Sequence, residues 1–180
     1  STLFPYTTLF RSLQNEINMV GEIIRLSHEK GCRVVFNASP IPKNPEELPL
    51  ELVDIFMVNE LEAAALAGTS AEGDFRDILK ALQKKYPKAA IVMTLGKDGV
   101  LYGYKEEFYS HPIFKVNAVD TTAAGDTFCG YFLAALCAGK SVEMALREAS
   151  AASAMAVSAK GAAPSIPVHS AMEEWLRGRS

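Results

Sequence analysis

The chain has 180 residues, of which 49% are apolar and 22% charged, and its formal net charge at pH 7 is −3. This length and composition predict one globular domain with a sizeable core. Lysine and arginine are scattered among acids, which argues against a nucleic-acid partner, and the longest apolar stretches stop well short of a membrane span. Three isolated cysteines, Cys32, Cys129 and Cys137, have no metal-ligand spacing. They favour a reduced, cytoplasmic setting, and we expect them to be small buried side chains.

The first twelve residues differ from the rest of the chain. Residues 1–12 show no helix cap, no clear period and no basic start before their apolar residues. We interpret them as a non-native leader, similar to a translated sequencing adapter, and exclude them from the fold. The expected domain is therefore 13–180, and we expect the natural protein to begin before Leu13.

From Leu13 onward, predicted helices and strands alternate along the chain. Apolar residues recur at helical spacing from Ile17 to Leu26, whereas residues 90–94 form an apolar run typical of a parallel strand buried on both faces. The expected elements are, in order, a helix ending at Gly31, strands at 33–36 and 52–58, helices at 60–67 and 75–86, strands at 90–94, 100–104 and 108–110, and helices at 127–138, 142–158 and 170–177. This order predicts a doubly wound, three-layer α/β/α sandwich, in which ligands bind beyond the carboxyl ends of the strands.

The segment 118–128 is the most informative about function. It combines small residues with Asp120 and Asp126 and opens a predicted helix whose first turn contains Asp126. Small side chains at a helix start leave backbone N–H groups accessible to an anion such as phosphate. Asp126 is then either a base that accepts a proton from a nucleophile attacking that phosphate, or simply the N-terminal cap of the helix.

Three weaker patterns follow other predicted elements. Asn59 and Glu62 suit the water shell of Mg²⁺ or phosphate oxygens, with an ordinary capping arrangement as the alternative. Residues 94–99 contain two glycines and form either a phosphate-approaching loop or a plain β-turn, and their spacing is not that of a Walker loop. Residues 159–165 leave a helix through Gly and Pro, and their carbonyls either face a cation or only terminate the helix.

Taken together, these motifs resemble the carboxyl-terminal half of the ribokinase-like carbohydrate kinases, the PfkB family. The motifs are Asn-x-x-Glu at 59–62, Thr-Leu-Gly-x-x-Gly at 94–99, Asp-Thr-Thr-Ala-Ala-Gly-Asp-Thr-Phe at 120–128 and Lys-Gly-Ala-Ala-Pro-Ser at 160–165. The resemblance runs from about Leu13 to Arg177. The Ala-Ala-Gly-Asp form favours the members that phosphorylate ribose.

The resemblance implies an ATP-dependent kinase that converts D-ribose to D-ribose 5-phosphate. It assigns Asp126 as the base that also contacts the sugar, Glu16 as a ribose contact, and the N–H groups of Ala123, Ala124 and Gly125 as the anion hole. The ATP-binding residues it implies are Asn59, Thr94, Leu95, Gly96, Lys97, Asp98, Gly99, Gly125, Asp126 and Ser150. It implies a Mg²⁺ site that includes Glu62. The monovalent cation site it implies, usually for K⁺, comprises Asp120, Thr122, Ala156, Ala159, Gly161 and Ser165.

Family members also carry an amino-terminal half with a sugar-binding segment and a β-sheet lid, which this sequence lacks. The resemblance therefore implies a whole enzyme that dimerises through the lid, and we expect this chain alone to be weakly active or inactive. Fructokinase, 2-keto-3-deoxygluconate kinase, nucleoside kinase and a non-catalytic nucleotide-binding module remain alternatives. A dinucleotide-binding dehydrogenase is disfavoured because no Gly-x-Gly-x-x-Gly follows the first predicted strand.

Overall fold

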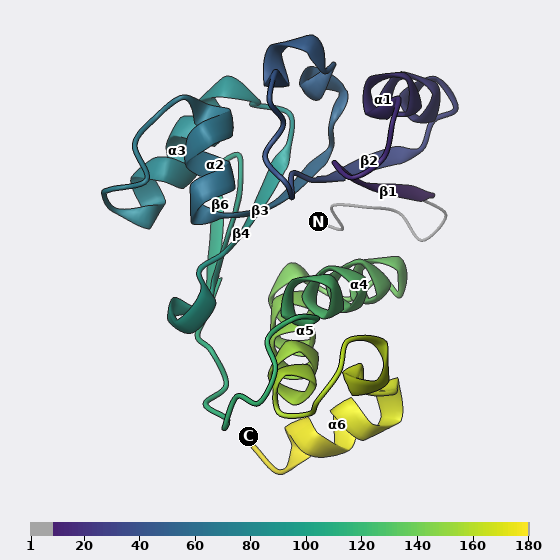
Figure 1. Cartoon of the computed structure of the whole chain (residues 1–180), viewed down its shortest axis with the longest axis vertical. Helices are drawn as coiled ribbons and strands as arrows, with labels where there is room; N and C mark the ends of the chain where they lie inside the picture. Colours follow the sequence, from purple (N-terminus) through teal and green to yellow (C-terminus); the bar gives the residue numbers. More distant parts are fainter. Residues whose placement is uncertain (1–8, 180) are drawn as a thin grey trace. The chain divides into compact units, whose positions relative to one another are not determined.

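The computed structural model describes residues 9–179, so most of the predicted leader, residues 1–8, lies outside the described part (Figure 1). The described residues form two compact units. We call residues 9–96 and 101–109 the sheet unit, and residues 97–100 and 110–179 the helical unit.

Strands and helices alternate through the sheet unit, as the sequence predicts. The strands are β1 (Phe10–Gln14), β2 (Arg33–Asn37), β3 (Ile55–Asn59), β4 (Ala90–Thr94), β5 (Val100–Tyr104) and β6 (Glu107–His111). The helices are α1 (Val20–Glu29), α2 (Glu60–Ala67) and α3 (Phe75–Lys85). Short 3-10 turns occur at η1 (Pro45–Glu47), η2 (Leu50–Leu52) and η3 (Gly96–Asp98).

The strands form a single six-stranded sheet in sequential order, β1 to β6, among the described residues. The pairs β1–β2, β2–β3 and β3–β4 are parallel, which confirms the predicted α/β class. In the β3–β4 register, Asn59 lies opposite Thr94. The carboxyl ends of these two strands are therefore aligned, and the segments that follow them start from the same edge of the sheet.

Both faces of the central strands are buried. Val34, Phe36, Phe56, Ile91 and Met93 pack in one cluster with residues of the three helices, including Ile24, Leu66 and Leu82. The alternating residues Val35, Ile55, Met57, Ala90 and Val92 are buried as well. Because successive side chains of a strand point to opposite faces, this continuous burial confirms the prediction for residues 90–94.

Two predictions about the start of the chain are wrong. Phe10, Arg11 and Ser12, which the sequence analysis excluded, belong to β1 and pair with Arg33, Val34 and Val35. Only Leu13 of this strand is buried, so no apolar alternation marks it in the sequence. The predicted helical face also begins too early: α1 starts at Val20, and Ile17 and Leu26 are exposed.

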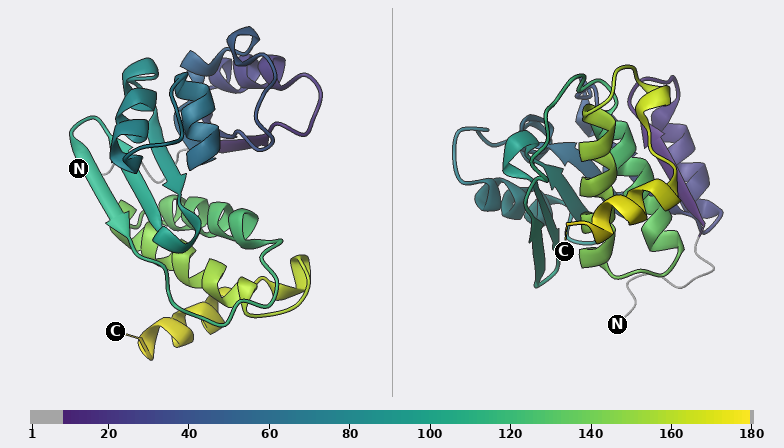
Figure 2. Two further views of the ribbon diagram at one scale, coloured as in Figure 1. Left: turned by 60° about the vertical axis from the view of Figure 1, so that its left-hand side comes forward. Right: turned by 90° about the horizontal axis from the view of Figure 1, so that it is seen from below.

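The helical unit contains α4 (Ala124–Cys137), α5 (Val142–Val157), the 3-10 turn η4 (Ala163–Ser165) and α6 (His169–Arg177). The two views of Figure 2 show α4 and α5 side by side. The buried alanines of α5, among them Ala145, Ala149 and Ala152, leave room for α4 to approach closely. Met172 of α6 packs with Ala151 and Ala152.

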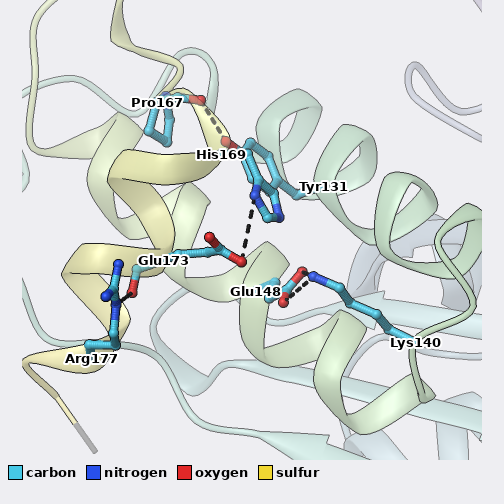
Figure 3. A network of polar contacts seen from close by, with 7 residues as sticks. All are labelled: Tyr131, Lys140, Glu148, Pro167, His169, Glu173 and Arg177. Carbon is cyan, nitrogen blue, oxygen red and sulfur yellow. Dashed lines mark hydrogen bonds and ion pairs between the residues drawn. The ribbon is translucent and has the colours of Figure 1, made fainter.

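Polar contacts tie α4 and α5 to the segments that connect the three helices (Figure 3). The Lys140 ammonium donates to both carboxylate oxygens of the buried Glu148, at 2.7 and 2.9 Å, and so neutralises that charge. The Tyr131 hydroxyl donates to the Pro167 carbonyl at 2.6 Å, between α4 and the segment before α6. Its burial, followed by the nearby Glu148 charge, raises the pKa of Tyr131.

Cys137 is exposed, whereas Cys32 and Cys129 are only half-buried. The expectation that all three cysteines are buried is therefore wrong, because Cys137 is the last residue of α4 and lies outside its buried face. No helix in the described residues 9–179 has the length and apolar character that crossing a bilayer requires.

Candidate active site

The carboxyl end of β3 presents Asn59 and Glu62 in a reciprocal capping box. The Asn59 Oδ1 atom accepts from the Glu62 N–H, and the Glu62 Oε2 atom accepts from the Asn59 N–H, each at 2.8 Å. The capping alternative is therefore confirmed. It fixes both side chains at the start of α2, and Glu62 is only 6% exposed. An amide and a carboxylate held in this way fit the water shell of a Mg²⁺ ion, because hard cations prefer oxygen ligands.

Thr94 ends the neighbouring strand β4 and lies opposite Asn59. Its hydroxyl donates to the Val58 carbonyl at 3.4 Å, a long bond that leaves the Thr94 side chain near the end of β3. The predicted nucleotide turn then continues through the buried Leu95 into the 3-10 turn formed by Gly96, Lys97 and Asp98, all three of which are exposed.

Gly99 closes this turn in a conformation that only glycine adopts readily. Its φ is +95°, and a Cβ atom at this position would lie 2.3 Å from the His111 carbonyl oxygen. The start of β5 and the end of β6 therefore approach each other too closely for any side chain. Packing therefore requires glycine at position 99, in addition to the close approach to a ligand that the sequence suggests.

Glu16 follows β1 and is exposed, as a substrate-contacting residue has to be. The preceding Asn15 is tied to the segment after β2: its N–H donates to Ser39 O at 3.3 Å, and its side-chain amide donates to Pro40 O at 2.9 Å. Glu16 thus stands at the carboxyl edge of the same parallel sheet as Asn59. Because β1 shows no apolar alternation, this placement of Glu16 could not be predicted from the sequence.

In the helical unit, Asp126 is the third residue of α4 and is exposed. The residue at the N-cap position is Ala123, so the prediction that Asp126 caps the helix is wrong. A carboxylate on the first turn still interacts favourably with the helix dipole. The Ala124 N–H, one of the three predicted anion-hole donors, already donates to the Thr121 carbonyl at 3.2 Å. The other first N–H groups of a helix have no carbonyl partner within the helix itself, so this turn is still a suitable place for an anion.

The loop before α4 is organised around Asp120. One carboxylate oxygen accepts from the Thr122 hydroxyl at 2.6 Å and from the Thr122 N–H at 3.0 Å, and the other accepts from the Gly161 N–H at 3.1 Å. These hydrogen bonds, the Thr122 hydroxyl first, lower the pKa of Asp120. The structure thus brings together three of the six predicted cation-site residues, from segments about forty positions apart.

The other predicted cation-site residues lie after the middle of α5. Val157 O accepts from the N–H groups of Val119 and Asp120 at 2.7 and 3.1 Å, which ties the Asp120 loop to the end of α5. The Ala159 N–H donates to Ala156 O, and the buried Ser165 hydroxyl donates to Ala162 O at 2.7 Å. Carbonyl, hydroxyl and carboxylate oxygens of this kind suit a hard cation. Ser150 is half-buried on α5.

Ser153, which none of the sequence motifs includes, contacts the start of α4. Ser153 of α5 donates its hydroxyl to the Ala124 carbonyl at 3.0 Å. A serine in an alanine-rich helix carries no local signal of such a contact, because its partner is 29 positions away.

The chain matches known proteins along most of its length. The profile of the pfkB family of carbohydrate kinases matches residues 12–169. The ribokinase of Haemophilus influenzae is 36% identical over 170 residues, which are 93% of this chain and 55% of that protein. The ribokinase of Bacillus subtilis is also 36% identical, over 91% of this chain and 54% of that protein.

Solved structures agree with this match. The ribokinase of Thermotoga maritima has a TM-score of 0.81 and 32% identity, covering 97% of this chain and 60% of that one. The ribokinase of Arabidopsis thaliana, complexed with ribose and ATP, has a TM-score of 0.82 and 31% identity over 93% of this chain and 55% of that one. The chain therefore spans little more than half the length of these relatives. Because the family profile covers most of its residues, the chain belongs to the pfkB family of carbohydrate kinases.

Proposed function

We propose that this chain carries the nucleotide-binding and phosphate-transfer part of an ATP-dependent sugar kinase. The reaction transfers the γ-phosphoryl group of ATP to the primary hydroxyl of D-ribose and yields D-ribose 5-phosphate and ADP. The relatives named ribokinase and the complex of one of them with ribose and ATP support this choice of substrates. The whole protein is then a cytoplasmic homodimer that assembles through its β-sheet lid, as the family resemblance implies.

The start of α4 is the observation that carries the proposal. Asp126 is exposed on a first turn built from small residues, where backbone N–H groups and a carboxylate share one location. In the proposed reaction, the Asp126 carboxylate accepts the proton of the sugar hydroxyl while that oxygen attacks the γ-phosphorus and ADP leaves. The N–H groups of the same turn stabilise the negative charge on the transferred group.

The remaining predicted residues take supporting roles. Asn59 and Glu62 hold the water shell of Mg²⁺, which neutralises phosphate charge when it is bound. Residues 94–99 and Ser150 bind the nucleotide. The Asp120 loop, with the carbonyls of residues 156–161 and the Ser165 hydroxyl, holds a monovalent cation such as K⁺. Glu16 contacts the ribose.

The test compares Asp126→Asn with the unchanged chain, using Mg²⁺, K⁺, ATP and a panel of ribose, deoxyribose, fructose, 2-keto-3-deoxygluconate and a nucleoside. The rate is measured in this chain fused to the amino-terminal part of the Haemophilus influenzae ribokinase, because the chain alone is expected to be weakly active. In that fusion we expect Asp126→Asn to lower ribose-dependent ADP release by about 10² to 10⁴-fold, and to change ATP affinity little. Asp77→Asn is the matched control, because Asp77 is also an exposed third residue of a helix, α3. Equal loss in both variants would contradict a catalytic role for Asp126.

The same assay separates the alternatives. Preference for fructose, 2-keto-3-deoxygluconate or a nucleoside over ribose would assign a different member of the family. The second candidate is a nucleotide-binding module without catalysis. It predicts ATP binding with no Asp126-dependent turnover even in the fusion, whereas the proposed kinase predicts turnover that Asp126→Asn removes.

A further inference from the structure

The first turn of α4 lacks the side chain that usually fixes a helix start. Its N-cap residue is Ala123, which has no side-chain hydrogen bond to the turn, and its second residue is Gly125. The turn also contains Thr127, whose hydroxyl is buried and makes no hydrogen bond within residues 9–179. A helix start with no side-chain cap and with glycine at its second position is prone to fray.

Ser153 supplies a hydrogen bond to this turn from the neighbouring helix. Its hydroxyl donates to the carbonyl of Ala124, the first residue of α4, at 3.0 Å, and both residues belong to the helical unit. Four positions further along α5, Val157 O accepts from the N–H groups of Val119 and Asp120. The carboxyl-terminal part of α5 therefore holds both the turn itself and the loop that leads into it.

The direction of the Ser153 bond matters for an anion site. A serine or aspartate at the N-cap would accept a hydrogen bond from the second or third N–H of the helix and so consume a donor. Ser153 donates to a carbonyl instead, so it stabilises the turn without using any of the N–H groups that an anion would approach.

We propose that Ser153 is a positioning residue for phosphate transfer: it holds the first turn of α4 so that its N–H groups and Asp126 keep their places around the γ-phosphoryl group. This inference rests on the proposed function. It adds a residue of α5 that lies outside all four sequence motifs.

The experiment measures the affinities of ADP and of the non-hydrolysable β,γ-imido analogue of ATP by calorimetry. The variants are Ser153→Ala, Ser153→Thr, which retains a hydroxyl, and Ser141→Ala. Ser141 caps α5 through the Met144 N–H at 3.2 Å, so its loss lowers stability without touching α4. We expect Ser153→Ala to lower the affinity for the analogue about three- to tenfold more than the affinity for ADP. This difference corresponds to roughly one hydrogen bond. In Ser153→Thr and Ser141→Ala, the ratio of the affinity for the analogue to the affinity for ADP should equal that of the unchanged chain.

A second measurement reports on the turn without any ligand. The Phe128 amide donates to the Ala124 carbonyl within α4, so its hydrogen exchange, followed by NMR, should accelerate in Ser153→Ala and not in Ser141→Ala. Unchanged exchange, or an unchanged affinity ratio, would overturn the role of Ser153. If the unchanged chain binds neither nucleotide, the proposed nucleotide site is wrong. The exchange rate of the Phe128 amide then tests by itself whether Ser153 stabilises the first turn of α4.

Discussion

Tyr102 shows how a single buried side chain affects this protein. It lies on β5, is almost fully buried, and packs against Tyr109 with ring centroids 5.9 Å apart. Its hydroxyl makes no hydrogen bond among the described residues. Burial, followed by the charges of Glu107, Tyr104 and Tyr109, raises the pKa of Tyr102 well above its ordinary value of 10.0. A buried hydroxyl without a partner costs stability that a phenyl ring does not.

The raised pKa predicts a loss of stability in alkali. Above about pH 10 the Tyr102 hydroxyl ionises in the unfolded chain but stays protonated in the folded one, so the unfolding free energy falls as pH rises. Tyr102→Phe should keep or increase stability at pH 7 and lose less of it between about pH 9 and 11. Urea denaturation across this range measures both effects. Parallel pH curves for the two proteins would contradict the prediction.

At the scale of elements, the contact between β5 and α3 depends on Gly103. A Cβ atom on Gly103 would lie 2.5 Å from the Leu79 side chain and 3.0 Å from the Gln83 amide nitrogen. Leu79 is fully buried, so it has little freedom to move. The strand therefore packs on the helix only because this position has no side chain.

We expect Gly103→Ala to lower the unfolding free energy by about 1 to 3 kcal/mol, because overpacking displaces Leu79 or the strand. Gly130→Ala is the matched control. Gly130 is exposed inside α4. Apart from its chain neighbours and the backbone of its own helix, no atom of residues 9–179 lies within 4 Å of the place a Cβ atom would take, and alanine there favours the helix by about 0.5 to 1 kcal/mol. Thermal unfolding distinguishes the two. A neutral Gly103→Ala variant would show that β5 and α3 can separate at no cost.

At the scale of the whole molecule, the chain covers 55% of the length of the Haemophilus influenzae ribokinase. A kinase has to exclude water from the transferring phosphoryl group and hold both substrates in line, which needs a complete sugar pocket. We therefore expect this chain alone to phosphorylate ribose slowly, although it carries Asp126 and the nucleotide motifs.

Fusing the amino-terminal part of that relative to this chain tests the expectation. The fusion should raise ribose-dependent ADP release on the order of a hundredfold, the effect of correct substrate placement. A fusion that carries Asp126→Asn is the control, because it supplies the same pocket without the base. Equal rates for the chain and the fusion would contradict the expectation.

Most elements and the order of the motifs can be predicted from the amino-acid sequence without any structure. Residues 90–94 are apolar throughout, and Asn59 with Glu62 forms a cap within four residues, so both patterns are local and readable. The motifs were sufficient to indicate the family, and the comparisons confirm it. Local patterns of this kind are visible because the interacting groups lie within a few positions of each other.

The features that join distant residues became visible only in the folded chain. β1 exists through its pairing with β2, Asn59 faces Thr94 through the parallel register, and Asp120 accepts from Gly161 across 41 positions. Ser153 reaches Ala124 in the same way. Such contacts leave no local period or spacing in the sequence, because strand register and helix packing are set by how the intervening chain folds.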